Sequence, residues 1–408
     1  MAGSTIDHLV SVIMFIGAIL LFISLFNQTL QTAILYQRHR NLATKCSDLL
    51  DNMLLNPGIP TDWSTTNYIP TGFGLQDPEF TQYRLSPFSL MRLNYSEGEL
   101  VYYDKTGEWY SNITIGFGKF LLVPMGKAVN YSTATKLLGV NGTYGFRLTI
   151  TPIVTVLISE VQSNPLTLNV EVVGTGFPLA NANLSYCFLT VEGTGGEGSY
   201  PAYTVEYGTN TTDAEGSALL SFPGFDGATE SYVFIVYAYL SGLMGVGYHE
   251  HVRYDENYVV PFISDFATGQ VLLAHSWDVH HGDNPAAITY NATFVMLTED
   301  FTLREMPLGE GKVGMLNYGQ DPQHAYENVT ISTHNPGILI VTYRKSAIQS
   351  GVVLMPWGIS SLAFPVSFGD DPFGREWVAT EIRQVTVNNI AYQAKLALWS
   401  LEGYEVID

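Results

Sequence analysis

Positive charge and cysteine are scarce in this sequence of 408 residues. It has 18 Lys and Arg against 38 Asp and Glu, which leaves a formal net charge of −20. Such a surface repels phosphate backbones, so we expect no nucleic-acid partner. The only cysteines, Cys46 and Cys187, are far apart in the sequence and provide neither a disulfide framework nor a CxxC site. We expect both to be small buried apolar residues.

Sequence motifs of common enzyme classes are also missing. The chain has no HExxH helix signature, no GxSxG nucleophile elbow, no GxxxxGK[ST] phosphate loop, and no GxGxxG between a strand and a helix. The sequence therefore predicts no catalytic residues, no cofactor and no enzymatic activity.

Aromatic residues, Gly and Pro are abundant instead. Aromatics make up 13% of the chain, with 25 Tyr, and there are 38 Gly and 19 Pro. This mixture favours β-rich surface domains over helical bundles. Segments that alternate apolar and polar residues, or are rich in β-branched residues, predict strands at 146–158, 166–172, 186–191, 232–240, 258–263, 269–274, 287–297, 337–344, 351–356 and 377–399.

Asparagine in N-x-S/T sequons is more frequent than chance would give. Besides Asn27, eight sequons follow the N-terminal apolar run, and a sequon marks exposed loops of secreted chains. We therefore expect this part of the chain to be extracellular, with N-glycosylation possible at these eight positions: Asn94, Asn112, Asn130, Asn141, Asn183, Asn210, Asn291 and Asn328.

The longest apolar run lies near the N-terminus. From Leu9 to Phe26 there are 18 residues without a charge, which as a helix extend about 27 Å. Asn56-Pro57-Gly58 breaks the helix. The sequence predicts one helix within residues 1–58, apolar all round in its first half and apolar along one stripe in its second, as shown by Leu42, Cys46, Leu49 and Met53 at steps of four, three and four.

The run lacks the basic start and the small-x-small exit of a cleaved secretory signal. Its length approaches the roughly 30 Å of a bilayer core, so it predicts a membrane anchor. Arg38, Arg40 and Lys45 follow the span, and the bias of positive charge alone would place them inside the cell. Long domains translocate largely regardless of that bias, so the sequons decide the orientation.

The first 155 residues resemble archaeal type IV pilin-like, or pseudopilin-like, surface proteins. The likeness rests on the helix and three segments in order: LLDNMLLNPGIPTDW at 49–63, GLQDPEFTQYRLSPFSLMRL at 74–93 and TKLLGVNGTYGFRLTI at 135–150. It implies that the helix associates with lipid, with copies of itself or with other pilin-like subunits. The implied contact residues are Leu9, Val12, Phe15, Ile16, Ile19, Phe22, Ile23 and Phe26.

One departure from that family concerns processing. Class III signal peptides carry Lys or Arg before the processing Gly, whereas only Met1-Ala2 precedes Gly3 here, which argues against processing after Gly3. Asp7 has two interpretations: it neutralises the amino terminus of a neighbouring subunit, or it stabilises the helix N-terminus together with Ser4 and Thr5.

Residues 160–250 resemble the bacterial Ig-like modules of invasin-type surface proteins. The likeness rests on Gly176-Phe177-Pro178 followed by a T-D-x-x-G turn at Thr212, Asp213 and Gly216. The predicted fold is mainly β with a long N-terminal α-helix, a pilin-like helix-plus-sheet unit followed by β-sandwich (Ig-like) domains. The predicted domains are the transmembrane and amphipathic helix 1–58, the pilin-like β domain 59–158, the Ig-like β-sandwich 159–250 and a C-terminal β domain 251–408.

Two functional hypotheses remain. The first is a membrane-anchored extracellular pilin-like subunit at the cell surface, single-pass or in a filament, which acts by helix association and displays its β domains to surface ligands. The alternative is an anchored surface enzyme, or a metal- or carbohydrate-binding protein. It would use four histidines that lie near carboxylates in the sequence: His249, His251, His280 and His281.

Overall fold

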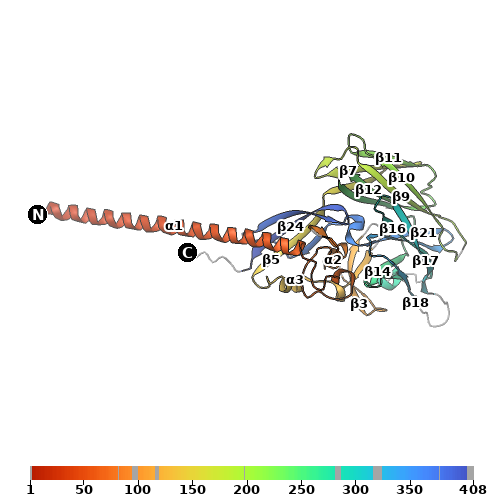
Figure 1. The fold of residues 1–408 in the computed structure, drawn as a ribbon, viewed down its shortest axis with the longest axis horizontal. Helices are drawn as coiled ribbons and strands as arrows, with labels where there is room; N and C mark the ends of the chain where they lie inside the picture. Colours follow the sequence, from red (N-terminus) through yellow and green to blue (C-terminus); the bar gives the residue numbers. More distant parts are fainter. Residues whose placement is uncertain are drawn as a thin grey trace.

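The computed structural model describes residues 2–80, 82–93, 100–114, 119–196, 198–280, 286–315, 324–375 and 377–401. Figure 1 shows a β-rich head at the end of one long helix, which confirms the predicted fold class. Helix α1 (Ala2–Leu54) has 53 residues and is therefore about 80 Å long. It ends two residues before Asn56, whose Oδ1 accepts a hydrogen bond from Gly58 N (2.9 Å), so the predicted break is confirmed.

The remaining helices are short. They are η1 (Trp63–Thr65), α2 (Pro87–Met91), η2 (Met125–Lys127), α3 (Tyr131–Leu137), α4 (Ser276–His280) and η3 (Ile359–Leu362). Side chains cap the N-termini of α2 and α3: Ser86 accepts from Ser89 N, and Asn130 accepts from Thr133 N. Figure 1 shows α2 and α3 beside the base of the long helix, whereas α4 packs on β2 (Val101–Tyr103), β14 (Val259–Asp265) and β15 (Gln270–His275).

The sheet that holds α1 combines strands from both ends of the chain, and its strand order is β1-β23-β24-β5-β22. Strands from the predicted ranges 59–158 and 251–408 therefore share this sheet, whereas the domain boundaries as such stay a prediction. The bounds are β1 (Arg84–Leu85), β5 (Tyr144–Pro152), β22 (Val366–Gly369), β23 (Ala379–Val387) and β24 (Ile390–Ser400).

Two predicted strands prove to be pairs of strands. The segment 146–158 changes sheets at Ile153, where β5 ends and β6 begins. The segment 377–399 is a hairpin of β23 and β24, which turns at Asn388 and Asn389 with φ of 46° and 68°. Asparagine tolerates this left-handed region better than most residues, which suits a two-residue hairpin turn.

The middle of the chain folds as a sandwich of two antiparallel sheets. One has the order β11-β7-β6, with β8 beside β7, and the other has the order β10-β9-β12-β13. Their facing side chains form a separate apolar core, which includes Phe188, Phe222 and Phe234. The bounds are β6 (Val154–Ser163), β7 (Leu166–Gly174), β8 (Phe177–Pro178), β9 (Asn183–Val191), β10 (Tyr203–Thr211), β11 (Ser217–Phe222), β12 (Ser231–Leu240) and β13 (Leu243–His251).

Three further sheets complete the head. Their orders are β14-β15-β19, β18-β17-β16-β20-β21 and β2-β3-β4. The bounds are β2 (Val101–Tyr103), β3 (Glu108–Thr114), β4 (Lys119–Pro124), β14 (Val259–Asp265), β15 (Gln270–His275), β16 (Ile288–Leu297), β17 (Leu303–Met315), β18 (His324–Ala325), β19 (Glu327–Thr330), β20 (Gly337–Ser346) and β21 (Gln349–Trp357).

The sandwich is packed rigidly onto the rest of the head. Strand β12 is buried on both faces, because Phe234 and Val236 enter the sandwich core while Val233 and Ile235 enter the main core. Buried Arg344 connects the main part of the head to the segment that follows β9 of the sandwich. Its Nη2 donates to Glu192 O (2.9 Å) and Thr194 O (3.1 Å). The sandwich is therefore a layer of the head and is not joined to it by a flexible linker.

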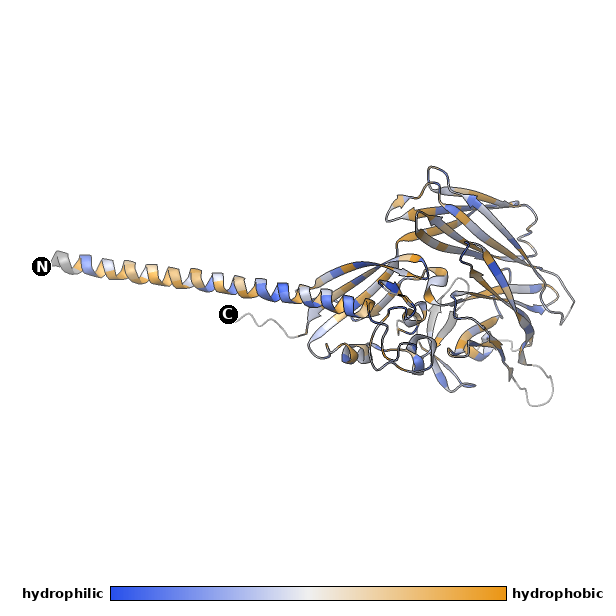
Figure 2. Ribbon diagram, in the orientation of Figure 1, coloured by the Kyte–Doolittle hydropathy of each residue, from blue (hydrophilic) through white to orange (hydrophobic). Residues whose placement is uncertain are grey.

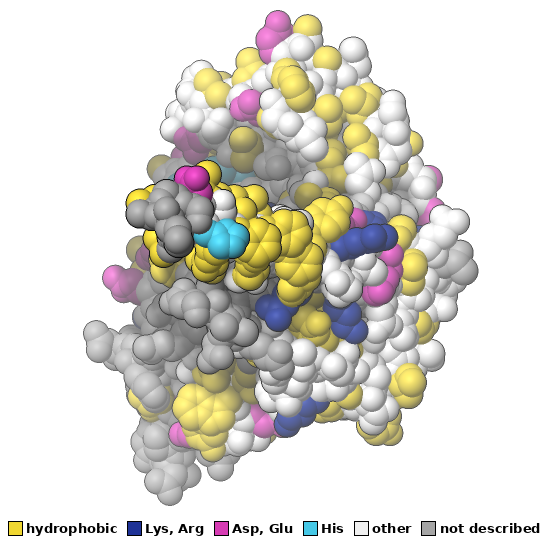
Figure 3. Space-filling model, turned by 90° about the vertical axis from the view of Figure 1, so that its left-hand side faces the viewer, with side chains coloured by type: hydrophobic (Ala, Val, Ile, Leu, Met, Phe, Trp, Pro, Cys, Tyr) yellow, Lys and Arg dark blue, Asp and Glu magenta, His cyan; other side chains and the backbone are white. Residues whose placement is uncertain are grey.

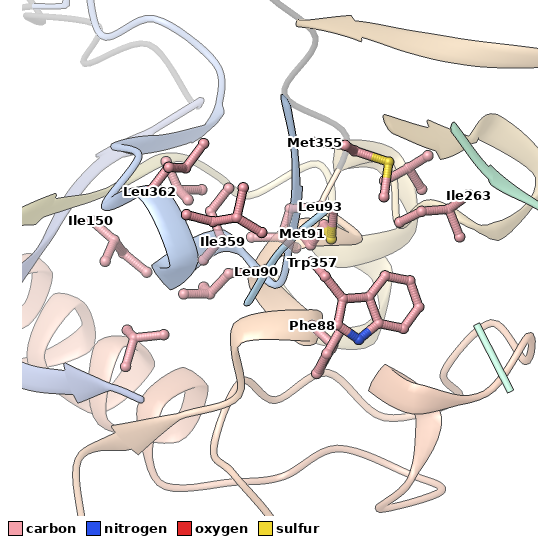
Figure 4. Packing of buried hydrophobic residues seen from close by; sticks show 14 of the residues in the cluster. Phe88, Leu90, Met91, Leu93, Ile150, Ile263, Met355, Trp357, Ile359 and Leu362 are labelled. Carbon is pink, nitrogen blue, oxygen red and sulfur yellow. The ribbon is translucent and has the colours of Figure 1, made fainter. Parts of the chain in front are cut away.

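The main core is continuous from α1 to the C-terminal strands. Figure 4 shows its centre, where Phe88 of α2 meets Trp357 of β21 with ring centroids 5.3 Å apart. Arg92, which is fully buried, follows α2 and donates to the carbonyl oxygens of Thr66 and Tyr68, both at 2.8 Å. Burial lowers the pKa of this guanidinium to about 10, and the carbonyl contacts fix the segment that connects α1 to the sheets.

Truncation of Leu50 tests how firmly α1 is held. Leu50, in the last turns of α1, is fully buried, whereas Leu55, just beyond the helix, is 44% exposed. We expect Leu50→Ala to lower the free energy of unfolding of the full chain in detergent by about 2–5 kcal/mol, because a buried Leu leaves a cavity. Leu55→Ala is the matched control with a smaller loss. Equal losses in denaturant titrations would contradict the packing described.

Candidate functional site

The N-terminal part of α1 extends away from the head (Figure 1). All residues from Ile6 to Arg38 are exposed, and Figure 2 shows that most residues along the outer part of the helix are hydrophobic and that hydrophilic residues become frequent just before the head. The predicted contact residues are between 41% and 71% exposed: Leu9, Val12, Phe15, Ile16, Ile19, Phe22, Ile23 and Phe26. Among the described residues, this is the one helix long and apolar enough to cross a membrane.

A shallow hollow lies on the exposed part of α1, toward the end that is nearer to the head. It is lined by Leu25, Gln28, Thr29, Thr32, Ala33 and Tyr36. The hydroxyl of Thr29 donates to Leu25 O (2.8 Å) and that of Thr32 donates to Gln28 O (2.9 Å). Both hydroxyls are therefore satisfied within the helix, which lowers the cost of placing them in an apolar environment.

The last turns of α1 are held by an apolar stripe flanked by an ion pair. Arg383 of β23 donates through Nε to Asp51 Oδ1 (3.0 Å) and through Nη2 to Ser47 Oγ (3.0 Å). Hydrogen bonds to Asp51, and then to Glu381, raise the pKa of this guanidinium. The stripe consists of Leu42, Cys46, Leu49, Leu50, Met53 and Leu54, all buried, and four of these were predicted as the second half of the helix pattern.

Both cysteines are buried and unpaired. The thiol of Cys46 donates to Leu396 O (3.5 Å) on β24, and burial raises its pKa to about 11. Burial also raises the pKa of Cys187, to about 12. Neither thiol ionises near neutral pH, so both act as apolar core residues.

The histidines of β13 have partners inside the sandwich. Tyr232 stacks on the rings of His249 and His251, with centroids 5.8 and 5.9 Å away, and its hydroxyl shares a hydrogen bond with His249 Nδ1 (2.9 Å). His251 Nε2 lies 3.2 Å from Gly227 O. Across the residues that the structure places, no group of three or more His, Cys, Asp and Glu side chains is arranged to hold a metal ion.

The other two predicted metal residues lie elsewhere. His280 ends α4, which packs on β2, β14 and β15 rather than on the sandwich. The side chain of His280 and the whole of His281 lie outside the described residues. A metal site that includes them stays a prediction.

The sequons differ in accessibility. Five of the asparagines are exposed: Asn130, Asn141, Asn183, Asn210 and Asn328. Asn291 is half-buried in β16, between β17 and β20. Asn94 and the side chain of Asn112 lie outside the described residues. Glycan attachment itself stays a prediction.

No family model and no curated protein matches this chain. Among solved structures it is similar to red sea bream transglutaminase, with 9% identity over 61% of this chain and a TM-score of 0.17; the match covers 37% of the length of that enzyme. It is also similar to the calcium-bound C2A and C2B domains of Extended-Synaptotagmin 2, with 10% identity over 64% of this chain, 98% of that chain and a TM-score of 0.09. Similarities this weak carry no argument about function.

Titration of His249 gives a test of the β13 environment. Burial is the largest effect and lowers the pKa of His249 below 6.5, with His251 acting in the same direction and Glu160 opposing it. Below about pH 6.5 the unfolded chain therefore binds a proton that the folded chain does not. We expect the free energy of unfolding to fall as the pH drops from 7.5 through 6.5, and to fall less in the His249→Gln variant.

Denaturant titrations of the full chain in detergent, at several pH values, measure how the free energy of unfolding changes with pH in the parent chain and in the variant. The variant also loses the hydrogen bond from Tyr232, so its stability at pH 7.5 provides the baseline. Identical pH slopes in the two proteins would show that His249 titrates alike in the folded and unfolded chains.

Proposed function

We propose that this protein is a membrane-anchored, extracellular, pilin-like structural subunit that acts by helix association and displays its β head at the cell surface. The observation that carries the proposal is the division of α1. Its last turns are held in the head by Leu50, Met53 and the Asp51–Arg383 pair, whereas residues 9–26 expose an apolar surface. Bare apolar surface of this extent is stable in lipid or against other helices.

The anchored form needs only the helix already described. The 18 uncharged residues Leu9 to Phe26 extend about 27 Å, close to the thickness of a bilayer core. The same surface serves a filament, in which the apolar half of α1 leaves the lipid and packs against copies of itself. The hollow around Thr29 and Ala33 supports close approach, because small residues let helix backbones come together.

The head supports a display role. Its sandwich is joined to the main core by β12 and Arg344, and five sequon asparagines are exposed on it and around it. A β-rich, acidic head presents a defined surface. In this proposal the ligands of that surface are other subunits or molecules at the cell exterior.

A charge in the middle of the span tests the anchor. Ile16→Arg places a guanidinium at the centre of the apolar run, which costs about 3 kcal/mol in a bilayer and corresponds to about a hundredfold weaker insertion. We expect the variant to lose flotation with lipid vesicles. Thr44→Arg, on the exposed side of α1 at the level of the head, is the matched control and should float like the parent chain. Equal flotation of all three proteins would refute the anchor.

A larger residue at Gly17 tests the filament. A Cβ at Gly17 meets nothing within 4 Å in the single chain, so Gly17→Leu leaves the isolated subunit and its anchoring unchanged. Where helices pack closely the added side chain keeps backbones apart. We expect fewer and shorter filaments in electron micrographs of surface preparations, with membrane-bound protein unchanged. Ile13→Leu, which keeps the side-chain volume, is the control. Normal filaments with Gly17→Leu would exclude close helix packing there.

A further inference from the structure

The described residues 370–375 and 377–378 of the connection between β22 and β23 lie beside α1, where the helix enters the head; we refer to them as the base loop. The indole of Trp377 contacts the ring of His39, with centroids 4.0 Å apart. Directly after the loop, Ala379 O accepts from the thiol of Cys46 (3.7 Å), and further along β23 Arg383 reaches Asp51. Strand β23 therefore runs away from the apolar half of α1, and the base loop is on the side of the head that faces it.

The base loop is built as a turn that projects an aromatic side chain. Phe373 N donates to Asp371 Oδ1 (2.9 Å), Arg375 N donates to Pro372 O (3.1 Å), and Gly374 has a φ of 76°. Gly accommodates this left-handed conformation without strain. Phe373 is 93% exposed, the highest value among the large apolar residues of the described head. The turn therefore presents the ring of Phe373 to the surroundings, and Trp377 of the same loop is 39% exposed.

The base loop carries charges of both signs. Asp370 and Arg375 are exposed, Asp371 is paired with Arg147 (3.1 Å), and Arg40 is exposed on α1. Figure 3, seen from the N-terminal side of the molecule, shows Lys and Arg side chains on the face of the head around the helix, with Asp or Glu beside one group of them. Aromatic residues with Arg and Lys are enriched where proteins contact the headgroups of a bilayer.

The length of the uncharged part of α1 determines the level of the base loop relative to the bilayer. No charged residue or His occurs from Leu9 to Gln37, and these residues extend about 44 Å at 1.5 Å per residue. A bilayer with its headgroup regions measures about 40–45 Å. If Asp7 and His8 lie at the outer edge of one headgroup region, the hydrocarbon core extends past Phe26 to about Thr32, and Arg38 to Arg40 lie at the outer edge of the other headgroup region. His39, and with it Trp377, is then level with the headgroups.

We propose that the base loop docks into the headgroup region of the same bilayer that holds α1. Phe373 and Trp377 enter the boundary between headgroups and acyl chains, and Arg40 and Arg375 bind lipid phosphates. The head is thereby held at a fixed height and tilt by two attachments, one through the membrane and one on its surface. This inference rests on the anchoring part of the proposed function, and it assigns a lipid-binding role to residues outside the helix.

The test uses the full chain with a polarity-sensitive dye on Phe373→Cys. The native thiols are buried, so the dye reacts at the introduced position. Phe177→Cys is the matched control. Phe177 is also an exposed aromatic residue (73% exposed), but it lies near the end of β5 that is opposite the base loop, about 30 Å away along this strand. Both proteins are inserted into vesicles of phosphatidylcholine and phosphatidylglycerol that contain a headgroup spin label, and flotation is measured in the same samples.

We expect a blue-shifted emission and strong spin-label quenching for the dye at position 373, and neither at position 177. The quenching should persist when the protein is diluted to about one chain per vesicle. Floating protein with no quenching at position 373 overturns the docking and leaves the anchor intact. Quenching that disappears on dilution overturns it as well, because the loop then contacts a second copy instead of lipid. Protein that does not float refutes the anchor and this inference together.

Discussion

The contact between the last turns of α1 and strands β23 and β24 is the interaction on which the rest of the structure depends. A helix of 53 residues with most of its length unsupported gains its orientation only from the part that is packed. Here that part is an apolar stripe closed at its edge by Asp51 and Arg383. The contact fixes the direction in which the exposed half leaves the head, and it also brings the base loop next to His39.

Local features of this fold could be predicted because their causes are local. The helix follows from an apolar run that becomes a stripe at Leu42, and it ends because Pro57 and Gly58 cannot continue it. The T-D-x-x-G turn is equally direct: Asp213 Oδ1 accepts from Glu215 N and Ser217 N, and Gly216 supplies a φ of 75°.

Features that depend on distant residues could not be predicted in this way. Strand β5 pairs with β24 from the C-terminal end of the chain, and periodicity carries no information about that partner. Strand β12 is apolar on both faces because it divides two cores, and Arg344 is buried only because the carbonyls of Glu192 and Thr194 converge on it. The partners of His249 and His251 likewise come from β12 and the loop before it. The base loop did carry a local signal, Asp371-Pro372-Phe373-Gly374, which predicts a turn with an aromatic tip but not its place beside the helix.

The pairing of β5 with β22 has a consequence for how such a chain is assembled from parts. Ile150 pairs with Val366, so the polypeptide leaves this sheet at Ile153 and returns to it at a neighbouring position after more than half of its length. The sandwich and the C-terminal sheets are, in topology, one large insertion between two adjacent strands. Exit and entry points that lie side by side let an insertion be exchanged for a longer or shorter one while the strands on either side keep their register. The helix and its sheet are thus contiguous in space although the chain between β5 and β22 builds other layers, and the contact of Phe88 with Trp357 joins the core of the inserted part to theirs.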